Sequence, residues 1–462
     1  MGIHHTQKTL PYGVSYAGPV RLLSGVRFLR DLTFIEGNQR RVEQEIFDAI
    51  FTMIDQAERL VLVDMFLFNE FQGSKPETTR MLARELTDHL IARRVARPDI
   101  NIYLLTDPIN TVYGGVSSPQ LERLRAAGVD VTVTDLSRLR DSNVFYSAVW
   151  RLLIKPWGNS EGGLLPSPFG DGQVSLRSYF SLANFKANHR KVVVADGPNG
   201  LIGLVTSANP HDGSSAHENV ALQFSGAAAL DLLLAEQAVM RFSGGPYQKL
   251  DAWLEGHAGL PVLESRPTGS MTMQIVSEHQ IEKAALQLIG RASEIDLAMF
   301  YLSDRDIVEG LKVAAYSGVP VRLILDPNKD AFGHAKGGIP NRQVAAELMQ
   351  IPGIQLRWAA TDGEQYHSKM LLTRDGNGGA NLLLGSANFT RRNLGDFNLE
   401  LSAVVSGPAT APVLQRASNY FERGWNNEAG LTFTTEYSSY REQSAFKNLA
   451  YRFMEWSGMS SF

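Results

Sequence analysis

Two histidine–lysine pairs occur in similar surroundings in this sequence. His189 and Lys191 precede the run VVV, and His367 and Lys369 precede the run MLL. Each apolar run predicts a buried strand. Residues i and i+2 of a strand point to the same face, so each histidine is expected to lie beside its lysine. Both pairs therefore present an imidazole and an ammonium group together.

The tripeptide Ser-Ala-Asn follows each pair at a similar distance, giving Ser207 and Asn209 after the first and Ser386 and Asn388 after the second. If the two repeats face each other, two histidines and two lysines converge on one small volume. So much potential positive charge predicts an anion between them, and phosphate is the natural candidate. The asparagine N–H groups are candidate donors to its oxygens, and the two serine hydroxyls are further candidates.

Such a constellation can cleave a phosphodiester. One histidine attacks phosphorus as a nucleophile, and the other protonates the leaving alkoxide. The lysines and asparagines stabilise charge on the equatorial oxygens in the transition state. Water or a second alcohol then releases the phosphoryl group. This chemistry requires no metal ion and no cofactor, and the two histidines are expected to titrate as a coupled pair near neutral pH.

The elements that must position these residues are predicted from alternating strands and helices, which indicate an α/β fold with parallel pairs. In the first half, strands are predicted at 59–69, 101–108 and 129–135, with helices at 77–96 and 119–128 and a core helix at 227–242 that closes this half. The second half repeats the plan, with strands at 294–302, 319–327 and 354–358. Two similar halves imply a pseudo-two-fold axis. We therefore expect an N-terminal unit at 1–260 and a C-terminal unit at 261–462.

Composition bounds the possible functions. The chain has 462 residues, a hydrophobic fraction of 44%, a formal charge of −4 and no cysteine. It can bury a large core, it has no thiolate nucleophile, and its charge weighs against a nucleic-acid partner. Neither a 20-residue apolar run nor a signal peptide is visible, so we expect peripheral membrane association or an anchor outside this sequence. The cytoplasmic or periplasmic side stays open.

The two motifs resemble the duplicated HKD motifs of the phospholipase D superfamily, including its bacterial phospholipase D and cardiolipin synthase-like members. This resemblance spans most of the chain and implies two pseudo-symmetric α/β/α sandwich halves with mixed, mostly parallel sheets. It assigns the acidic position of the first motif to Asp196. In the second motif Arg374 takes the equivalent position, and Asp375 is the acid one residue later.

The resemblance also implies a downstream acid that orients each histidine. Glu400 in NLELS and Glu218 in HENVAL are the candidates. Another alignment of the halves places Asn219 opposite Glu400, and the choice favours Glu218. The catalytic set is thus His189, Lys191, Asp196, Glu218, His367, Lys369, Asp375 and Glu400, with His189 as nucleophile and His367 as acid and base.

Other polar residues have simpler interpretations. Asp107 and Asp326 each end a strand before a proline and are expected to cap turns. His211, Asp212 and His217 lie in a loop after Asn209, where they either rim the site or belong to an ordinary polar loop.

The first half carries an insertion at 136–183 that the second half lacks. It combines aromatic and aliphatic residues with Arg138, Arg140, Arg151 and Lys155. This mixture suits an element that enters a lipid interface, and it equally suits a self-packed lid. Prolines and glycines at 156–172 predict that part of it is irregular.

The function expected from the resemblance and the insertion is a phosphodiesterase or transphosphatidylase acting on glycerophospholipids. The expected partners are a phospholipid substrate and a membrane surface, with no nucleic acid, and the internal pseudo-two-fold favours a monomer. The alternative is a metal-independent nuclease of the same superfamily, which would show a basic groove with stacking aromatics. A non-catalytic lipid-binding protein is a third possibility, but neither histidine–lysine pair is lost.

Overall fold

The computed structural model describes the chain except residues 1, 24, 74–75, 77–78, 198–199, 257–269, 332–333, 443, 459 and 461–462. The boundary expected between residues 260 and 261 lies outside the described residues. The division into units at 1–260 and 261–462 therefore stays a prediction.

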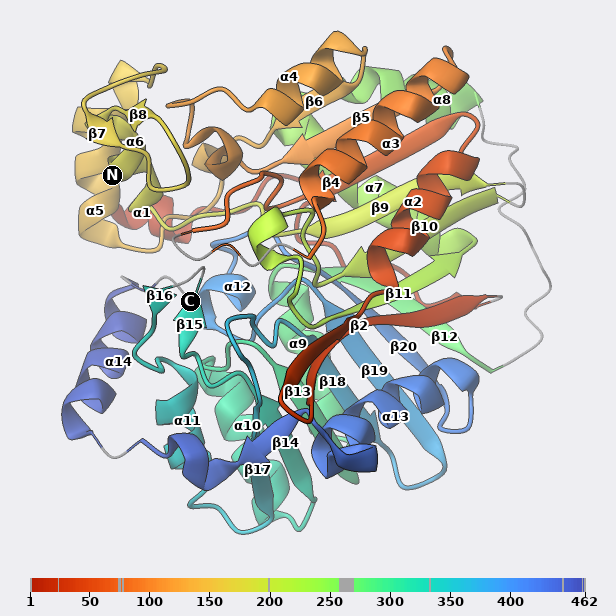
Figure 1. Ribbon diagram of the computed structural model, residues 1–462, viewed down its shortest axis with the longest axis vertical. Helices are drawn as coiled ribbons and strands as arrows, with labels where there is room; N and C mark the ends of the chain where they lie inside the picture. Colours follow the sequence, from red (N-terminus) through yellow and green to blue (C-terminus); the bar gives the residue numbers. More distant parts are fainter. Residues whose placement is uncertain are drawn as a thin grey trace.

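Each half contributes one large mixed sheet (Figure 1). The first sheet has the order β21-β2-β11-β10-β9-β4-β5-β6, with β3 paired to β2. Its strands are β2 (Val26–Glu36), β3 (Gln39–Glu43), β4 (Leu60–Met65), β5 (Asn101–Thr106), β6 (Asp130–Val133), β9 (Lys191–Gly197), β10 (Gly200–Thr206), β11 (Asn219–Ser225) and β21 (Leu431–Thr432).

The second sheet has the order β1-β12-β20-β19-β18-β13-β14-β17-β22. Its strands are β1 (Arg21–Leu22), β12 (Thr272–Ser277), β13 (Glu294–Met299), β14 (Val321–Leu325), β17 (Ile354–Ala359), β18 (Lys369–Arg374), β19 (Gly379–Gly385), β20 (Leu401–Pro408) and β22 (Thr434–Glu436). The seven strands from β12 to β17 repeat the order from β2 to β6, which confirms the α/β fold with two related halves.

The expectation of mostly parallel sheets is wrong. Parallel pairing is restricted to β4-β5-β6 in the first sheet and β13-β14-β17 in the second. The strand that follows each histidine is antiparallel to both of its neighbours. Strands β9, β10 and β11 are consecutive in the chain and adjacent in the sheet, and each pairs with the next in antiparallel orientation. The valines of β9 are buried on both faces because other layers cover the sheet, and not because its neighbours are parallel.

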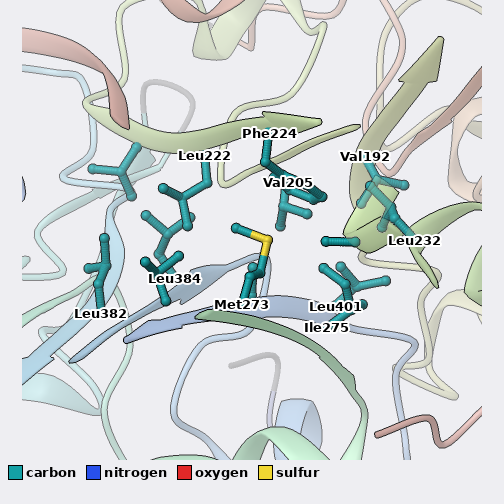
Figure 2. Packing of buried hydrophobic residues seen from close by; sticks show 14 of the residues in the cluster. Val192, Val205, Leu222, Phe224, Leu232, Met273, Ile275, Leu382, Leu384 and Leu401 are labelled. Carbon is teal, nitrogen blue, oxygen red and sulfur yellow. The ribbon is translucent and has the colours of Figure 1, made fainter. Parts of the chain in front are cut away.

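The two sheets pack against each other through their inner faces. Figure 2 shows Leu222 and Phe224 of the first sheet opposite Leu384 and Met273 of the second. Two helices, α7 (Ala227–Phe242) and α13 (Pro412–Asn426), contribute to the same core and contact strands of both sheets. The apolar stretch 227–242, predicted to be a core helix closing the first half, forms α7 with those bounds.

Helices cover the outer face of each sheet. The first sheet carries α2 (Ile46–Gln56), α3 (Leu82–Ala96) and α4 (Pro119–Ala126). The second carries α9 (His279–Ile289), α10 (Arg305–Tyr316) and α11 (Asn341–Leu348). Helix α8 (Tyr247–Gly256) follows α7 and packs on it. The layers are thus helices, sheet, shared core, sheet and helices.

Short strands cross between the halves. β1 lies at residues 21–22 but pairs with β12 of the second sheet. β21 lies at residues 431–432 but pairs with β2 of the first sheet. Each sheet therefore ends in a strand supplied by the other half of the chain, which joins the two halves by backbone hydrogen bonds as well as by the shared core.

The insertion at 136–183 forms a small subregion beside the edge strand β6 (Figure 1). It contains η2 (Leu136–Arg138), α5 (Val144–Val149), η3 (Trp150–Ile154), η4 (Lys155–Trp157), β7 (Leu165–Pro166), β8 (Gln173–Val174) and α6 (Leu176–Leu182). The N-terminal helix α1 (Gly2–Gln7) packs on α5. Between η4 and α6, only the two-residue strands β7 and β8 interrupt the expected irregular loop.

The C-terminal part ends in helix α14 (Ala445–Ser457), which packs on α11. Shorter elements complete the described chain: η1 (Pro108–Thr111), η5 (Asp212–Ser214), β15 (Asp330–Ala331), β16 (His334–Ala335), α12 (Arg391–Leu394), η6 (Glu428–Gly430) and η7 (Tyr437–Tyr440). None of the described helices combines the length and the apolar composition that crossing a membrane requires.

Candidate active site

The two histidines lie directly before β9 and β18, at the edge where the parallel strands end. Lys191 pairs with the last residue of β4, and Lys369 pairs with the last residue of β13. The N–H of His189 donates to the carbonyl of Leu399 at 2.9 Å, and the N–H of His367 donates to the carbonyl of Glu218 at 2.9 Å. Leu399 belongs to the second half and Glu218 to the first, so each histidine is anchored by the opposite half.

All four cationic side chains are buried and lie within each other's electrostatic reach. Burial lowers the pKa of His189 to about 4, with a smaller contribution from Lys191 and Lys369. Burial, and then Lys369, His217 and Lys191, hold the pKa of His367 well below its ordinary value. A lysine of the opposite half thus contributes to the lowered pKa of each histidine. The structure brings the two pairs together, as the spacing of the motifs predicts.

The lysines are held in matching ways in the two halves. Lys191 Nζ donates to the carbonyl of His189 at 2.7 Å, and Lys369 Nζ donates to the carbonyl of His367 at 2.8 Å. An ammonium group has three donors, so each lysine keeps capacity for an anion. Burial lowers the pKa of Lys191 to about 7 and, together with the Lys191 charge, lowers the pKa of Lys369. An anion bound here would raise these pKa values.

An aromatic ring supports each pair. Phe66, directly after β4, lies 4.8 Å from the ring of His189 and 5.1 Å from Lys191 Nζ. Phe300, directly after β13, lies 5.0 Å from the ring of His367 and 5.1 Å from Lys369 Nζ. An ammonium group over an aromatic face is stabilised by the ring quadrupole. Each ring also excludes water from one side of its histidine.

The partner of each imidazole breaks this symmetry. His189 Nδ1 lies 2.8 Å from Glu400 Oε1, whereas His367 Nδ1 lies 3.1 Å from Asn219 Oδ1. Burial alone would raise the pKa of Glu400, but His189, Lys191 and the Ser386 hydroxyl hold it below its ordinary value. Glu400 is therefore a carboxylate at neutral pH. One histidine faces a negative charge and the other faces a neutral amide.

The hydrogen bonds of Asn219 fix the tautomer of His367. The Asn219 amide N–H donates to the carbonyl of His217 at 2.9 Å, and the Ser207 hydroxyl donates to Asn219 Oδ1 at 2.9 Å. An amide oxygen only accepts, so His367 Nδ1 carries a proton and Nε2 presents its lone pair. A carboxylate likewise only accepts, so His189 has the same tautomer. Both Nε2 atoms are available for phosphorus chemistry.

Ser207 and Ser386 were expected to contact phosphate, and the structure places them elsewhere. The Ser207 hydroxyl donates to Asn219, and the Ser386 hydroxyl donates to Glu400 Oε2. Both serines are fully buried behind the residues that orient the histidines. A buried hydroxyl satisfies its donor with the nearest strong acceptor, here the side chain on the adjacent strand. The serines therefore position Asn219 and Glu400.

Asn209 and Asn388 follow the ends of β10 and β19 at the same sheet edge as the histidines. Asn209 Oδ1 accepts from the N–H of Leu67 at 3.2 Å, which leaves its amide N–H groups available to an anion. The side-chain oxygen of Asn388 is buried and has no partner among the described residues. Their predicted contact with phosphate stays a prediction.

Asp196 and Asp375 do not contact the histidines. The Asp196 carboxylate accepts from the N–H groups of Glu58, Arg59 and Leu60, at 2.9 to 3.1 Å, where β4 begins. It is five residues along β9 from Lys191, about 17 Å at the rise of a strand. Asp375 accepts from the N–H groups of Asn377 and Gly379 in the exposed turn between β18 and β19. The expected catalytic role of both acids is contradicted by these positions.

Glu218 is also not the residue that orients His367. Its carbonyl accepts from the His367 N–H, but its carboxyl group accepts from the Tyr420 hydroxyl at 2.7 Å. Burial raises the pKa of Glu218 to about 8. Adjacent residues of a strand point to opposite faces, so only Asn219 can face the histidine. The structure therefore has the other alignment of the two halves, in which Asn219 and not Glu218 corresponds to Glu400.

Asp107 and Asp326 have a larger role than the turn caps that the sequence predicts. Each caps its turn, since Asp107 accepts from the N–H of Ile109 and Asp326 accepts from the N–H of Asn328. The other oxygen of Asp107 accepts from the N–H of Asn188 at 2.6 Å. The other oxygen of Asp326 accepts from the N–H of Tyr366 at 2.8 Å. Each aspartate therefore fixes the backbone of the residue before a histidine. The repeated Asp-Pro dipeptide is the feature of the sequence that indicated a shared role for the two aspartates.

A buried charge network behind Glu400 escaped the sequence analysis. Arg190 is fully buried between Glu236, at 3.1 Å, and Glu278, at 2.7 Å. Glu278 Oε1 also accepts from the N–H of Glu400 at 3.1 Å, so the network fixes the backbone of the residue that orients His189. Glu278 has φ of +49°, a left-handed conformation that costs energy for a residue other than glycine. The feature of the sequence that could have indicated this network is the arginine between His189 and Lys191.

The polar loop after Asn209 contributes one residue to the rim of the site. The rings of His217 and His367 lie 5.8 Å apart. His211 Nδ1 contacts the Ser214 hydroxyl, and the Asp212 carboxylate accepts from the N–H of Ala83, so both stabilise local structure. Among the described residues no group of three or more histidine and acidic side chains is arranged to hold a metal ion.

Comparisons of the sequence find similar proteins. The sequence model of the family described as "Cardiolipin synthase, PLD-like domain" matches residues 285–425. A cardiolipin synthase from Geobacillus kaustophilus (strain HTA426) is 23% identical over 375 residues, which cover 78% of this chain and 61% of that protein. Residues 285–425 are thus similar to the phospholipase D-like domain of cardiolipin synthases.

A solved structure shares the fold over nearly the whole chain. The crystal structure of a phosphatidylserine synthase from Haemophilus influenzae Rd KW20 superposes with a TM-score of 0.55 at 11% identity, covering 96% of each chain. At this identity the likeness shows the fold alone. The chain matches 61% of the length of the Geobacillus cardiolipin synthase, so the activity of that whole protein does not transfer directly.

Proposed function

We propose that this protein cleaves the phosphodiester of glycerophospholipids through a phosphohistidine and transfers the phosphatidyl group to water or to an alcohol. The observation that carries the proposal is the convergence of two buried histidine–lysine pairs whose imidazoles have different partners. The matches to a cardiolipin synthase and a phosphatidylserine synthase support a phospholipid as substrate.

In the first step, His189 Nε2 attacks phosphorus and the bond from phosphorus to the headgroup oxygen breaks. For this step His367 has to be an imidazolium in the substrate complex, with a proton on Nε2 as well as on Nδ1, and the leaving alkoxide takes the Nε2 proton. The lysines and the two asparagines neutralise the non-bridging oxygens as charge develops on them. In the second step, water or an alcohol gives its proton to His367 and attacks phosphorus, which releases His189.

The partners of the imidazoles support this division of roles. A phosphorylated imidazole that keeps its Nδ1 proton is cationic, and Glu400 places a negative charge 2.8 Å from that atom. Only His189 has such a partner. Asn219 is neutral, so His367 remains the stronger acid and gives up its proton readily. Burial and then the lysine charges lower the pKa of His367, and a bound phosphate anion offsets the part due to the lysines.

The test is incubation of the purified chain with mixed phospholipid vesicles in the presence of ethanol. Formation of phosphatidylethanol establishes the lipid substrate and transfer through an enzyme-bound intermediate. His189→Ala and His367→Ala should each lose about 10³-fold or more in rate, as removal of a nucleophile or an acid predicts. His279→Ala, at a histidine outside the site that is paired with Glu282, is the matched control and should retain full activity.

Brief mixing with labelled phospholipid, followed by mapping of acid-labile, base-stable phosphate, should place the adduct at residue 189. Label retained in His189→Ala but lost in His367→Ala would reverse the two roles. Cleavage of DNA while every phospholipid survives would instead establish the nuclease and reject the proposal.

The proposed lipid substrate implies a peripheral association with a membrane surface.

A further inference from the structure

Exposed apolar side chains are concentrated in the insertion and in α14. Twelve of the twenty-one large apolar side chains exposed in the described chain lie in these two segments. Scattered exposed apolar residues are normal on a protein surface, but a concentration of them marks an interaction site. The catalytic centre does not explain why these two segments expose so many apolar side chains.

Helix α14 presents an apolar stripe to solvent. Phe446, Leu449, Phe453 and Trp456 are exposed, with Trp456 at 80% and Phe446 at 79%. Their spacing places them on one face of the helix. The opposite face carries Tyr451, which is buried in the core of the second half. The helix is thus anchored on one side and leaves a second apolar side uncovered among the described residues.

The insertion has the same two-sided character. Trp150 and Ile154 line a cavity of about 470 Å³ that the insertion forms with η1 and the end of β6. Leu152, Leu153 and Trp157 point away from it and are exposed, Trp157 at 75%. The self-packed lid and the interface element that the sequence left as alternatives are thus two faces of one segment.

The two exposed faces lie on the same side of the molecule. Figure 1 shows α5 and α6 above α14 along one edge. The side-chain amide of Asn143, at the start of α5, donates to the carbonyl of Ser457, at the end of α14, at 2.8 Å. The docking face is defined here as the exposed apolar residues of the segment 144–176 and of α14.

The docking face borders the catalytic centre. Thr134, which lines the insertion cavity, accepts from the amide of Asn188 next to His189. On the other side, Glu455 of α14 accepts from the Ser303 hydroxyl at 2.7 Å, close to Phe300. Asn393 of the neighbouring helix α12 donates to the Glu400 carboxylate. A surface that covers the docking face would therefore lie beside the edge where the histidines meet.

The charge of both segments is opposite to that of the whole chain. Residues 136–183 carry five lysines and arginines against three acids, and residues 441–457 carry three against two, whereas the chain has a formal charge of −4. Lys155 is exposed beside Leu153, and the Arg177 guanidinium contacts the carbonyl of Trp157. Aromatic and aliphatic side chains with cations among them are the composition of elements that enter an anionic lipid interface.

We propose that the docking face binds the surface of a bilayer that contains anionic phospholipid and holds the catalytic edge against the headgroups. The role of the docking face rests on the proposed function, because a diacyl substrate resides in a bilayer. The occupant is lipid and not a protein surface, since both segments combine tryptophan, phenylalanine and leucine with a local cationic excess.

The test is flotation of the full chain with vesicles of phosphatidylcholine, with or without phosphatidylglycerol. The wild-type chain should float with the anionic vesicles and less with phosphatidylcholine alone, and high salt should weaken the difference. Leu449→Ser/Trp456→Ser in α14 and Leu153→Ser/Trp157→Ser in the insertion should each reduce the partition coefficient by about tenfold or more. Val313→Ser/Tyr316→Ser, at exposed apolar residues of α10, is the matched control and should float as the wild type does.

Flotation does not require turnover, so its result is independent of the proposed function. With a short-chain phospholipid below its critical micelle concentration, both docking variants should keep wild-type rates, while their rates on vesicles fall. A wild-type chain that floats but acts on neither lipid rejects the proposed function and keeps the docking face. A wild-type chain that does not float overturns the docking face, as does an α14 variant that floats normally. The proposal is also overturned if the wild-type chain forms a dimer and does not bind vesicles, while the α14 variant is a monomer. That result would identify a second copy of the chain as the occupant of the docking face.

Discussion

At the scale of single residues, the two histidines differ mainly in the group that holds Nδ1. His189 faces a carboxylate and His367 faces an amide, while the lysine, the phenylalanine and the aspartate that anchors the backbone are matched. A protein built from two copies of one motif could use either histidine as nucleophile. The difference between Glu400 and Asn219 separates their acidities and so assigns one role to each.

Glu400→Gln removes the negative charge beside His189 and keeps the size of the side chain. The carboxylate raises the pKa of His189 against burial, so its loss lowers that pKa below about 4 and leaves His189 neutral at neutral pH. We expect kcat to fall by about 10²- to 10³-fold because the cationic phosphohistidine loses its counter-charge. The measurement is the rate of phosphatidylethanol formation, and an unchanged rate would contradict the assigned role of Glu400.

Asn219→Asp tests the acid. A carboxylate at this position raises the pKa of His367 by about one unit or more. The acid must be protonated in the active form, so activity falls as the pH rises through the pKa of His367. In the variant this fall should occur at a pH about one unit higher than in the wild type. The measurement is the pH profile of kcat/KM, with thermal unfolding as control because the variant loses the hydrogen bond to His217. Movement of the acidic limb instead would show that His367 is the nucleophile.

At the scale of elements, strands deliver the reactive groups at one end and are anchored at the other. β9 begins at Lys191 in the site and ends near Asp196, whose carboxylate binds three backbone N–H groups at the start of β4. The spacing of a motif does not require that each of its residues performs chemistry. Asp196 fixes the alignment of β9 and β4, and through it the position of His189 beside Phe66.

Asp196→Ala should therefore destabilise the protein more than it slows the reaction. Leaving three N–H groups without their charged acceptor should lower the free energy of unfolding by about 1–3 kcal/mol. Denaturant unfolding measures this loss, and the rate of the folded variant should remain within about twofold of wild type. A large loss of rate with unchanged stability would restore a catalytic role to Asp196.

At the scale of the whole molecule, the site exists only because the two halves are packed face to face. The inner faces of both sheets share one core, and β1 and β21 cross between the sheets (Figures 1 and 2). The backbone N–H of each histidine is bound to a carbonyl of the opposite half. The halves should therefore unfold together rather than one after the other.

Leu384→Ala tests this coupling, since Leu384 is fully buried between the sheets. Truncating such a core leucine should cost about 2–5 kcal/mol. Hydrogen exchange should show β9 and β18 losing protection by similar amounts, although Leu384 belongs to the sheet of β18 alone. Loss of protection in β18 while β9 keeps its protection would contradict a single cooperative unit.

Sequence alone determined the parts of this protein that depend on local geometry. The i, i+2 spacing of His189 and Lys191, and of His367 and Lys369, put each pair on one strand face, and the repeat indicated two related halves. The helix at 227–242 followed from its apolar composition. These properties are set within a few residues, where the periodicity of a strand or a helix decides which way a side chain points.

Only the tertiary structure decided which groups meet across the two halves. It selected Asn219 over Glu218 as the partner of His367, placed Asp196 and Asp375 away from the site, and turned Ser207 and Ser386 toward the orienting side chains. A shift of one residue along a strand exchanges the face that a side chain occupies. That choice is made by packing between segments far apart in the chain, which a single sequence does not record.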